Sequence, residues 1–256
     1  MSKIKTKLEA RRPPPNKAPK PSLFGEIEFA CRRFVDLQVH TVVRDITPWL
    51  ATRKGVLLDV GCGDQPYRRL LSAECKYVGL DWDNSTTEFS VTRSSEVTYF
   101  DGRKFPFVDG YFDSVLNTDV LEHVKDTDLF LAECRRVLKP GGEMMLTVPF
   151  QARYHFIPYD YWRFTSSGLT EVLDRASFFD VKIVARGSDV TVAAYKCVGV
   201  LFRLAFSGPT GKVIFILLFW LVILLLLVAH ASLVFGLGSS DDCLGYSATA
   251  RRLAED

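Results

Sequence analysis

Two segments of this 256-residue chain carry side chains whose types and spacing suit chemistry. The first joins the apolar run Val56–Val60 to a Gly61-Cys62-Gly63 turn, and Asp81 follows twenty residues after Gly61, at the end of a second apolar run. Glycines after a buried strand let the backbone approach a ligand, and a carboxylate at the end of the next strand can accept both hydroxyls of a ribose. The spacing is typical of a nucleotide-type ligand site, although a glycine pair alone also occurs in an ordinary tight turn.

The second segment, His155–Thr165, gathers histidine, aspartate, arginine and large aromatic side chains. His155 is the first candidate for a general base, because an unperturbed imidazole titrates near neutrality. Asp160 is the second, either as a base or as the group that orients His155. Tyr161 and Arg163 are candidate substrate ligands, Arg163 for an anionic group such as a phosphate. The alternative is a lid whose polar side chains only hold the loop together.

The elements that would position these side chains alternate between strand and helix. Strands are predicted at Val56–Val60, Tyr77–Leu80, Val97–Phe100, Phe112–Leu116, Glu143–Val148, Val181–Val190 and around Leu244–Ala250. Helices are predicted over Phe24–Leu50 as one or two segments, around Tyr67–Leu71, from about Asp119 to Leu138, and at about Ser167–Ala176. This alternation predicts a parallel α/β sheet covered on both faces.

Several sequence blocks in a fixed order resemble those of class I S-adenosylmethionine-dependent methyltransferases of the methyltransferase type 11 kind. The blocks are Val56–Gly63, Tyr77–Asp81, Phe105–Phe107, Phe112–Val115, Leu121–Val124 and Arg136–Gly142. The resemblance implies a Rossmann-like seven-stranded sheet and S-adenosyl-L-methionine as cofactor. A dehydrogenase fingerprint is not satisfied, because Pro66 stands where that motif needs Gly or Ala. One departure from the family is Gln65, at a position that is often Gly.

The resemblance also assigns cofactor contacts by position. It implies that Asp59 and the backbone of Gly61 and Gly63 hold the methionine end, and that Asp81 binds the ribose. Two more pairs follow from it, Asp101 and Gly102 at the adenine, and Asn117 and Thr118 at the sulfonium. The Leu121-Glu122-His123 element usually orients the neighbouring helix in this family, so His123 is given that role rather than a catalytic one.

The His155–Thr165 pattern resembles small membrane-associated methyltransferases of bacterial cell-surface glycan and lipid pathways. It implies methyl transfer at the membrane to a lipid-linked or amphipathic acceptor, first a hydroxyl of a glycolipid or polyprenyl-linked sugar. A quinone precursor or another lipid is the alternative acceptor. An inactive, cofactor-binding membrane scaffold is the alternative function.

Residues 213–237 form an uncharged, strongly apolar stretch of twenty-five residues. As one helix it would reach about 37 Å, enough for a hydrocarbon core of about 30 Å, and a transmembrane helix is one interpretation. If the last strand returns to the sheet, however, the insert must enter and leave on the same side. A helical hairpin that dips into the cytoplasmic leaflet is therefore favoured over a single crossing or burial against protein.

The predicted organisation has four parts: a disordered basic tail over 1–22, a methyltransferase domain over 23–190, a hydrophobic membrane-associating insert over 191–240, and the last strand with the C-terminus over 241–256. The tail holds five prolines and seven cationic side chains against one Glu. The six cysteines contain no C-x-x-C pair, and no His/Cys cluster has zinc spacing, so no metal is expected. Neither a secretory leader nor a nucleic-acid partner is predicted, and the expected location is the cytoplasmic face of a membrane.

Overall fold

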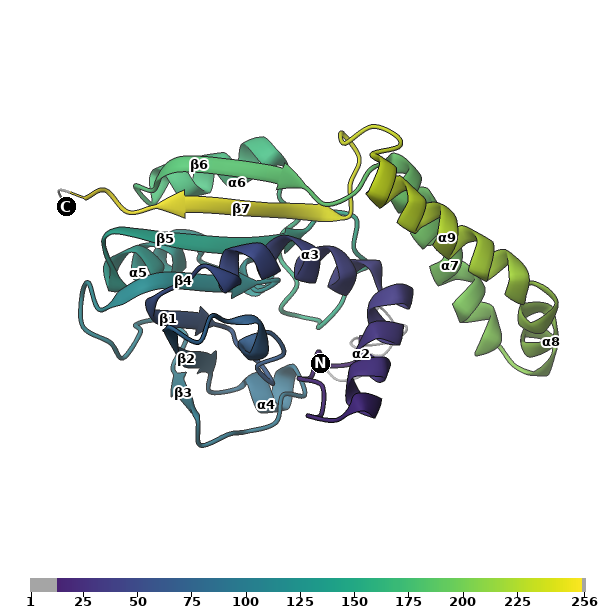
Figure 1. Ribbon diagram of the computed structural model, residues 1–256, viewed down its shortest axis with the longest axis horizontal. Coiled ribbons are helices and arrows are strands. Elements are labelled where there is room, and N and C mark those ends of the chain that lie inside the picture. Colours follow the sequence, from purple (N-terminus) through teal and green to yellow (C-terminus); the bar gives the residue numbers. More distant parts are fainter. Residues whose placement is uncertain (1–12, 255–256) are drawn as a thin grey trace.

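The computed structural model describes residues 13–254, which fold around one seven-stranded sheet with the order β3-β2-β1-β4-β5-β7-β6 (Figure 1). The strands are β1 (Gly55–Val60), β2 (Cys75–Trp82), β3 (Val97–Phe100), β4 (Phe112–Thr118), β5 (Leu138–Pro149), β6 (Phe179–Ala185) and β7 (Gly245–Arg251). Only β7 runs antiparallel to its neighbours β5 and β6. The Rossmann-like methyltransferase sheet implied by the sequence is thereby confirmed.

Helices cover both faces of the sheet, as expected for parallel strands. They are α2 (Leu23–Val35), α3 (Leu37–Ala51), α4 (Ser85–Glu88), α5 (Thr127–Val137), α6 (Ser166–Arg175), α7 (Asp189–Ala205), α8 (Pro209–Leu217) and α9 (Phe219–Phe235), with short 3-10 turns η1 (Arg68–Leu70) and η2 (Leu121–His123). Successive strand residues point to opposite faces. Leu57 therefore packs against α2 and α3, whereas Leu58 packs in the cluster that holds α5 and α6.

Several predicted bounds differ from the structure for local reasons. The helix expected from about Asp119 begins only at Thr127, because the Asp126 side chain caps it by accepting from the Leu129 N–H. The strand expected to run to Val190 ends at Ala185, because Ser188 and Thr191 form a capping box that begins α7. Around Tyr67–Leu71 only the 3-10 turn η1 forms.

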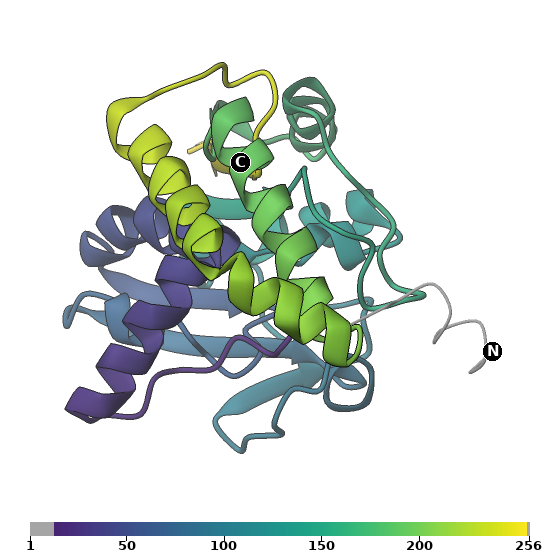
Figure 2. The same cartoon turned by 90° about the vertical axis from the view of Figure 1, so that its right-hand side faces the viewer.

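In the chain, an antiparallel helical hairpin lies between β6 and β7, and it projects beyond the carboxyl ends of the parallel strands (Figures 1 and 2). Helices α7 and α9 form its two arms, and α8 lies across its tip. Buried hydroxyls of Thr191 and Ser232 lie 2.6 Å apart between the arms, and His230 Nε2 lies 2.9 Å from the Phe34 carbonyl of α2. The continuous helix expected over residues 213–237 is broken at Leu218, since the chain must reverse there to bring β7 back to the sheet.

Among the described helices, none alone has the length and hydropathy to cross a membrane; α8 and α9 meet that requirement only as a pair bent by 58°.

Residues 13–22 differ from the disordered tail that the sequence predicts for 1–22; residues 1–12 lie outside the described part. Asn16 Nδ2 donates to the Tyr67 hydroxyl at 2.7 Å, and Arg32 donates to the Pro15 carbonyl at 2.9 Å. Lys17 makes a backbone bridge to Asp64 beside the glycine turn. The proline run thus lies along the cofactor end of the sheet with fixed partners.

Candidate active site

A cavity of about 1470 Å³ lies at the carboxyl ends of the strands. Its lining includes the turn after β1 with the ends of β2 and β3, the loops after β4 and β5, and the inner face of α7. The segment 13–16 and the corner between α2 and α3 also contribute to it. Ligand sites commonly enclose about 300–1,000 Å³, so this cavity has room for two ligands side by side.

The turn after β1 leaves open space for a ligand beside an acidic side chain. Gly61 and Gly63 have φ of +73° and +51°, and a Cβ on Gly63 would meet no atom closer than 3.9 Å. Asp81 accepts hydrogen bonds from the Gly63 N–H at 3.0 Å and the Trp82 N–H at 2.7 Å. Burial raises the pKa of Asp81 to about 6, although both N–H groups act in the opposite direction. This arrangement suits a carboxylate that accepts ribose hydroxyls.

Three more predicted cofactor residues, Asp101, Gly102 and Thr118, also line the cavity. The exposed Asp101 accepts from the Arg103 N–H at 2.9 Å, and Gly102 has a φ of +85° beside the Trp82 indole. Gln65, at the position where glycine was expected, has a φ of +53°, a backbone conformation that glycine adopts most easily. The departure in sequence therefore leaves the turn itself intact.

Asp59 and Asn117 do not line the cavity, although the resemblance placed them at the cofactor. Both side chains are buried behind its wall. Asp59 accepts from the Tyr77 hydroxyl at 2.7 Å, and burial raises its pKa to about 7. Asn117 Nδ2 donates to the Val60 carbonyl at 3.0 Å and so ties β4 to the end of β1. Their role in this structure is to hold the wall.

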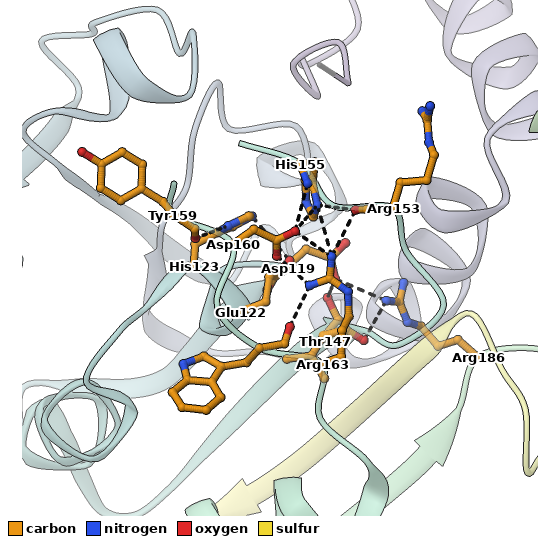
Figure 3. Close-up of polar contacts among 12 residues, drawn as sticks. Asp119, Glu122, His123, Thr147, Arg153, His155, Tyr159, Asp160, Arg163 and Arg186 are labelled. Carbon is orange, nitrogen blue, oxygen red and sulfur yellow. Dashed lines mark hydrogen bonds and ion pairs between the residues drawn. The ribbon is translucent and has the colours of Figure 1, made fainter. Parts of the chain in front are cut away.

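The loop after β5 brings together three of the four predicted residues of the second segment, His155, Asp160 and Arg163 (Figure 3). His155 lines the cavity, as does the fourth residue, Tyr161. His155 Nδ1 lies 2.9 Å from the Arg153 carbonyl and 3.1 Å from Asp160 Oδ2. Arg163 donates to both oxygens of Asp160, at 2.6 Å and 2.7 Å. Asp160 and Arg163 do not line the cavity, and Asp160 supports His155 from outside it.

Comparisons with known proteins agree with this geometry. Residues 58–146 match the methyltransferase domain family. The chain carries a class I S-adenosylmethionine-dependent methyltransferase domain. It is 30% identical over 131 residues to a "probable S-adenosylmethionine-dependent methyltransferase" of Mycolicibacterium smegmatis, which covers 48% of this chain and 51% of that protein. It is 34% identical over 100 residues to the ubiquinone biosynthesis O-methyltransferase of Mesorhizobium japonicum, covering 35% of this chain and 39% of that one.

A solved structure shares the fold: phosphoethanolamine N-methyltransferase 2 of Haemonchus contortus with S-adenosyl-L-methionine, at a TM-score of 0.50 and 19% identity, covering 84% of this chain and 52% of that one. The chain spans about half the length of the curated relative in Mycolicibacterium smegmatis. The residues of the cavity fit S-adenosylmethionine as cofactor. There is open space over Gly63, and Asp81 lines the same cavity.

The sequence did not indicate the pairing of a buried arginine with Asp119 at the cavity wall. Arg186 is fully buried, and its guanidinium lies 3.3 Å from Asp119 Oδ1 and 3.0 Å from the Val148 carbonyl. Thr147 donates to the same Asp119 oxygen at 2.9 Å, which fixes the carboxylate at the cavity wall. Asp119 has a φ of +51°, a strained conformation that this pairing helps to hold.

Glu122 and His123 also line the cavity, beside His155 (Figure 3). His123 Nδ1 lies 2.8 Å from the Tyr159 carbonyl, and burial, followed by the charge of His155, lowers the pKa of His123 to about 4. Burial, followed by the charge of Asp119, raises the pKa of Glu122 well above its ordinary value. The Leu-Glu-His element therefore contributes side chains to the site as well as shaping the turn.

Proposed function

We propose that this protein transfers the methyl group of S-adenosylmethionine to a hydroxyl of a lipid-linked or amphipathic acceptor at the cytoplasmic face of a membrane. The first candidate is a glycolipid or a polyprenyl-linked sugar. The observation that carries the proposal is the shared cavity: its lining runs from the cofactor turn to α7, one arm of the apolar hairpin. An acceptor held along α7 would have its reactive end beside the cofactor and its apolar end toward the hairpin.

The surface of the hairpin supports contact with lipid. Large apolar side chains are exposed along its tip and outer arm: Ile216, Leu217, Trp220, Leu224, Leu227, Val234 and Phe235. Trp220 is 77% exposed and Leu217 is 75% exposed. An apolar surface of this extent marks an interaction site rather than an ordinary water-facing helix. Anchoring at a bilayer would raise the effective concentration of an acceptor confined to the same surface.

The chemistry proposed for the site is an in-line displacement at a sulfonium-bound methyl group, for which S-adenosylmethionine supplies the electrophile. The wall residues position the two reactants, which accounts for much of the rate in such a reaction. His155 Nδ1 lies beside two hydrogen-bond acceptors, the Arg153 carbonyl and the Asp160 carboxylate. The neutral ring therefore carries its proton on Nδ1, and Nε2 keeps a lone pair. His155 can then accept the hydroxyl proton through Nε2, with Asp160 as the group that positions it.

A quinone precursor is the second candidate acceptor. The relative from Mesorhizobium japonicum is named as a ubiquinone biosynthesis O-methyltransferase, and the aligned 100 residues are 34% identical to this chain. A prenylated phenol would place its ring near His155 and its tail along α7, so it uses the same two ends of the cavity. A cofactor-binding scaffold without turnover remains the non-enzymatic alternative.

The direct test is to incubate the full chain in membranes with methyl-labelled S-adenosylmethionine and fractionated lipid extracts. The expected result is label in a lipid fraction, released with the glycan head group after mild acid. Label in a prenylated phenol would favour the quinone precursor. Cofactor binding with no labelled product from any extract, and no slow turnover to S-adenosylhomocysteine, would overturn the enzymatic proposal in favour of the scaffold.

A further inference from the structure

Three potential ligands converge on one side of the cavity: Glu122 and His123 from η2, and His155 from the loop after β5 (Figure 3). One carboxylate oxygen and one nitrogen from each imidazole all lie within 4.8 Å of one another. We propose that these side chains bind a divalent transition-metal ion. No metal-ligand spacing is visible in the sequence, because His155 lies thirty-two positions after His123 and only the fold brings the two together.

Both histidines are held in the orientation that metal ligands need. His123 Nδ1 lies 2.8 Å from the Tyr159 carbonyl, and His155 Nδ1 lies 2.9 Å from the Arg153 carbonyl. A carbonyl oxygen only accepts, so each Nδ1 carries the proton and each Nε2 keeps its lone pair. Histidines that ligate metals almost always donate their other N–H to a carbonyl or carboxylate in this way. His155 Nδ1 has Asp160 Oδ2 as a second acceptor, at 3.1 Å.

The side chain of Glu122 is buried without a hydrogen-bond partner, and this favours a bound cation. Its side chain is 0% exposed, and neither carboxylate oxygen has a hydrogen-bond partner in the structure. Its backbone carbonyl accepts from the Tyr161 and Trp162 N–H groups, which fixes the residue in place. Ionising this carboxyl group while it is buried without a partner is costly, and a bound cation would offset that cost. Glu122 Oε1 lies 3.6 Å from His123 Nε2, close to the roughly 3.4 Å expected between two ligands of a tetrahedral ion.

The ligand set indicates which ion would bind. Two imidazoles and one carboxylate suit zinc, iron(II), cobalt(II) or manganese(II), whereas magnesium and calcium prefer oxygen ligands alone. Three protein ligands leave at least one coordination position, and all three residues line the cavity, so that position faces the proposed acceptor site. An ion there would coordinate the acceptor hydroxyl and make it more acidic.

This inference does not rest on the proposed acceptor, because the ion can bind whether or not a lipid is the substrate. Coordination uses the same Nε2 lone pair with which His155 would accept a proton. In the metal-loaded protein His155 is therefore a ligand, and the hydroxyl proton leaves to solvent from the coordinated oxygen. Metal binding and lipid methylation can be measured separately, so failure of one does not imply failure of the other.

The test uses tag-free full chain, stripped with a chelator and titrated with cobalt(II), followed by zinc(II) competition. We expect one ion per chain, visible ligand-field absorption, and a higher melting temperature with metal. Glu122→Gln and His155→Ala should each weaken binding about tenfold or more. The matched control is His230→Gln, because His40 and His230 also lie close, with ring centroids 4.8 Å apart, but outside the cavity. That variant should bind like the wild type.

Two results would overturn the proposal: a folded wild-type protein that binds no cobalt(II) stoichiometrically, or Glu122→Gln and His155→Ala variants that bind it as tightly as the wild type. Cofactor binding by calorimetry confirms that each variant is folded. If the chelated protein still methylates lipid at the full rate although it binds cobalt(II) at one site, the ion has no catalytic role; the metal site and the proposed function would then both stand.

Discussion

Arg163 and Asp160 form a two-point ion pair directly beneath His155: Nη1 lies 2.6 Å from Oδ1, and Nη2 lies 2.7 Å from Oδ2. The backbone N–H of His155 also donates to Asp160 Oδ2, at 2.9 Å. Burial would raise the pKa of Asp160, but the hydrogen bonds from His155 and Arg163 more than offset this and hold that pKa well below its usual range. Asp160 is thus a poor general base and a well-placed positioning residue.

Replacing this carboxylate should destabilise the protein in a pH-dependent way. Asp160→Asn loses charge-assisted hydrogen bonds to a buried group, so the free energy of unfolding should fall by roughly 1–3 kcal/mol at pH 7. Because the folded pKa lies below the unfolded value of about 3.9, the contribution is present above about pH 4 and is lost below it. Urea unfolding of both proteins at several pH values measures the difference.

The control for that prediction is Asp128→Asn, which breaks an exposed ion pair with Arg175 at 2.8 Å. Exposed pairs contribute about 1 kcal/mol or less, so this variant should change little. A difference between wild type and Asp160→Asn that stays constant from pH 7 to pH 3 would contradict the assigned role of the charge.

The Asp81 carboxylate, which is expected to bind the ribose of the cofactor, gives a second prediction. Asp81→Asn should weaken binding of S-adenosylmethionine at least about tenfold, because the amide cannot accept from two hydroxyls as a carboxylate does. The pKa of Asp81 in the free protein is raised to about 6. Wild-type affinity should therefore decline as pH falls below about 6, and the variant should lack that part of the pH dependence. Calorimetry between pH 5.5 and pH 8 tests both statements; unchanged affinity in a folded Asp81→Asn protein would refute the ribose assignment.

What the sequence could predict depended on local signals. The glycine turn, Asp81 and the strand alternation are encoded within short apolar runs, so the sheet and most of the cofactor end followed from them. The burial of Asp59 and Asn117 behind the cavity wall did not follow from the sequence, because a motif position does not say whether a strand side chain points into a cavity or behind it. Arg186 gave no signal at all, since a cation after an edge strand is ordinarily exposed.

The segment His155–Thr165 also shows how far local sequence patterns can predict a site. The residue types of Asp160 and Arg163 predict a charged site, but only the folded loop shows that the two side chains pair with each other. The meeting of His155 with Glu122 depends on how the loop after β5 packs over η2, and no local pattern specifies that packing.

The hairpin surface yields a third prediction. Trp220→Glu and Leu217→Glu should each reduce binding to phosphatidylcholine vesicles about tenfold or more, because a large apolar side chain contributes about 1.5–3 kcal/mol when it leaves water. Zwitterionic vesicles separate this contribution from that of the basic N-terminal residues, which favour anionic lipid. The matched control is Val108→Glu, equally open at 69% exposure in the loop before β4. Vesicle flotation with equal recovery of all three variants would argue against the hairpin as the membrane contact.

The last prediction concerns His155, whose Nε2 is proposed either to accept a hydroxyl proton or to bind a metal ion. In metal-stripped protein, His155→Ala should lower the single-turnover rate about 10²–10⁴-fold while cofactor affinity changes little. His230→Gln is the control, because it removes an imidazole that lies outside the cavity. If His155→Ala instead reacts at the wild-type rate, then the acceptor needs neither a base nor an ion at this position.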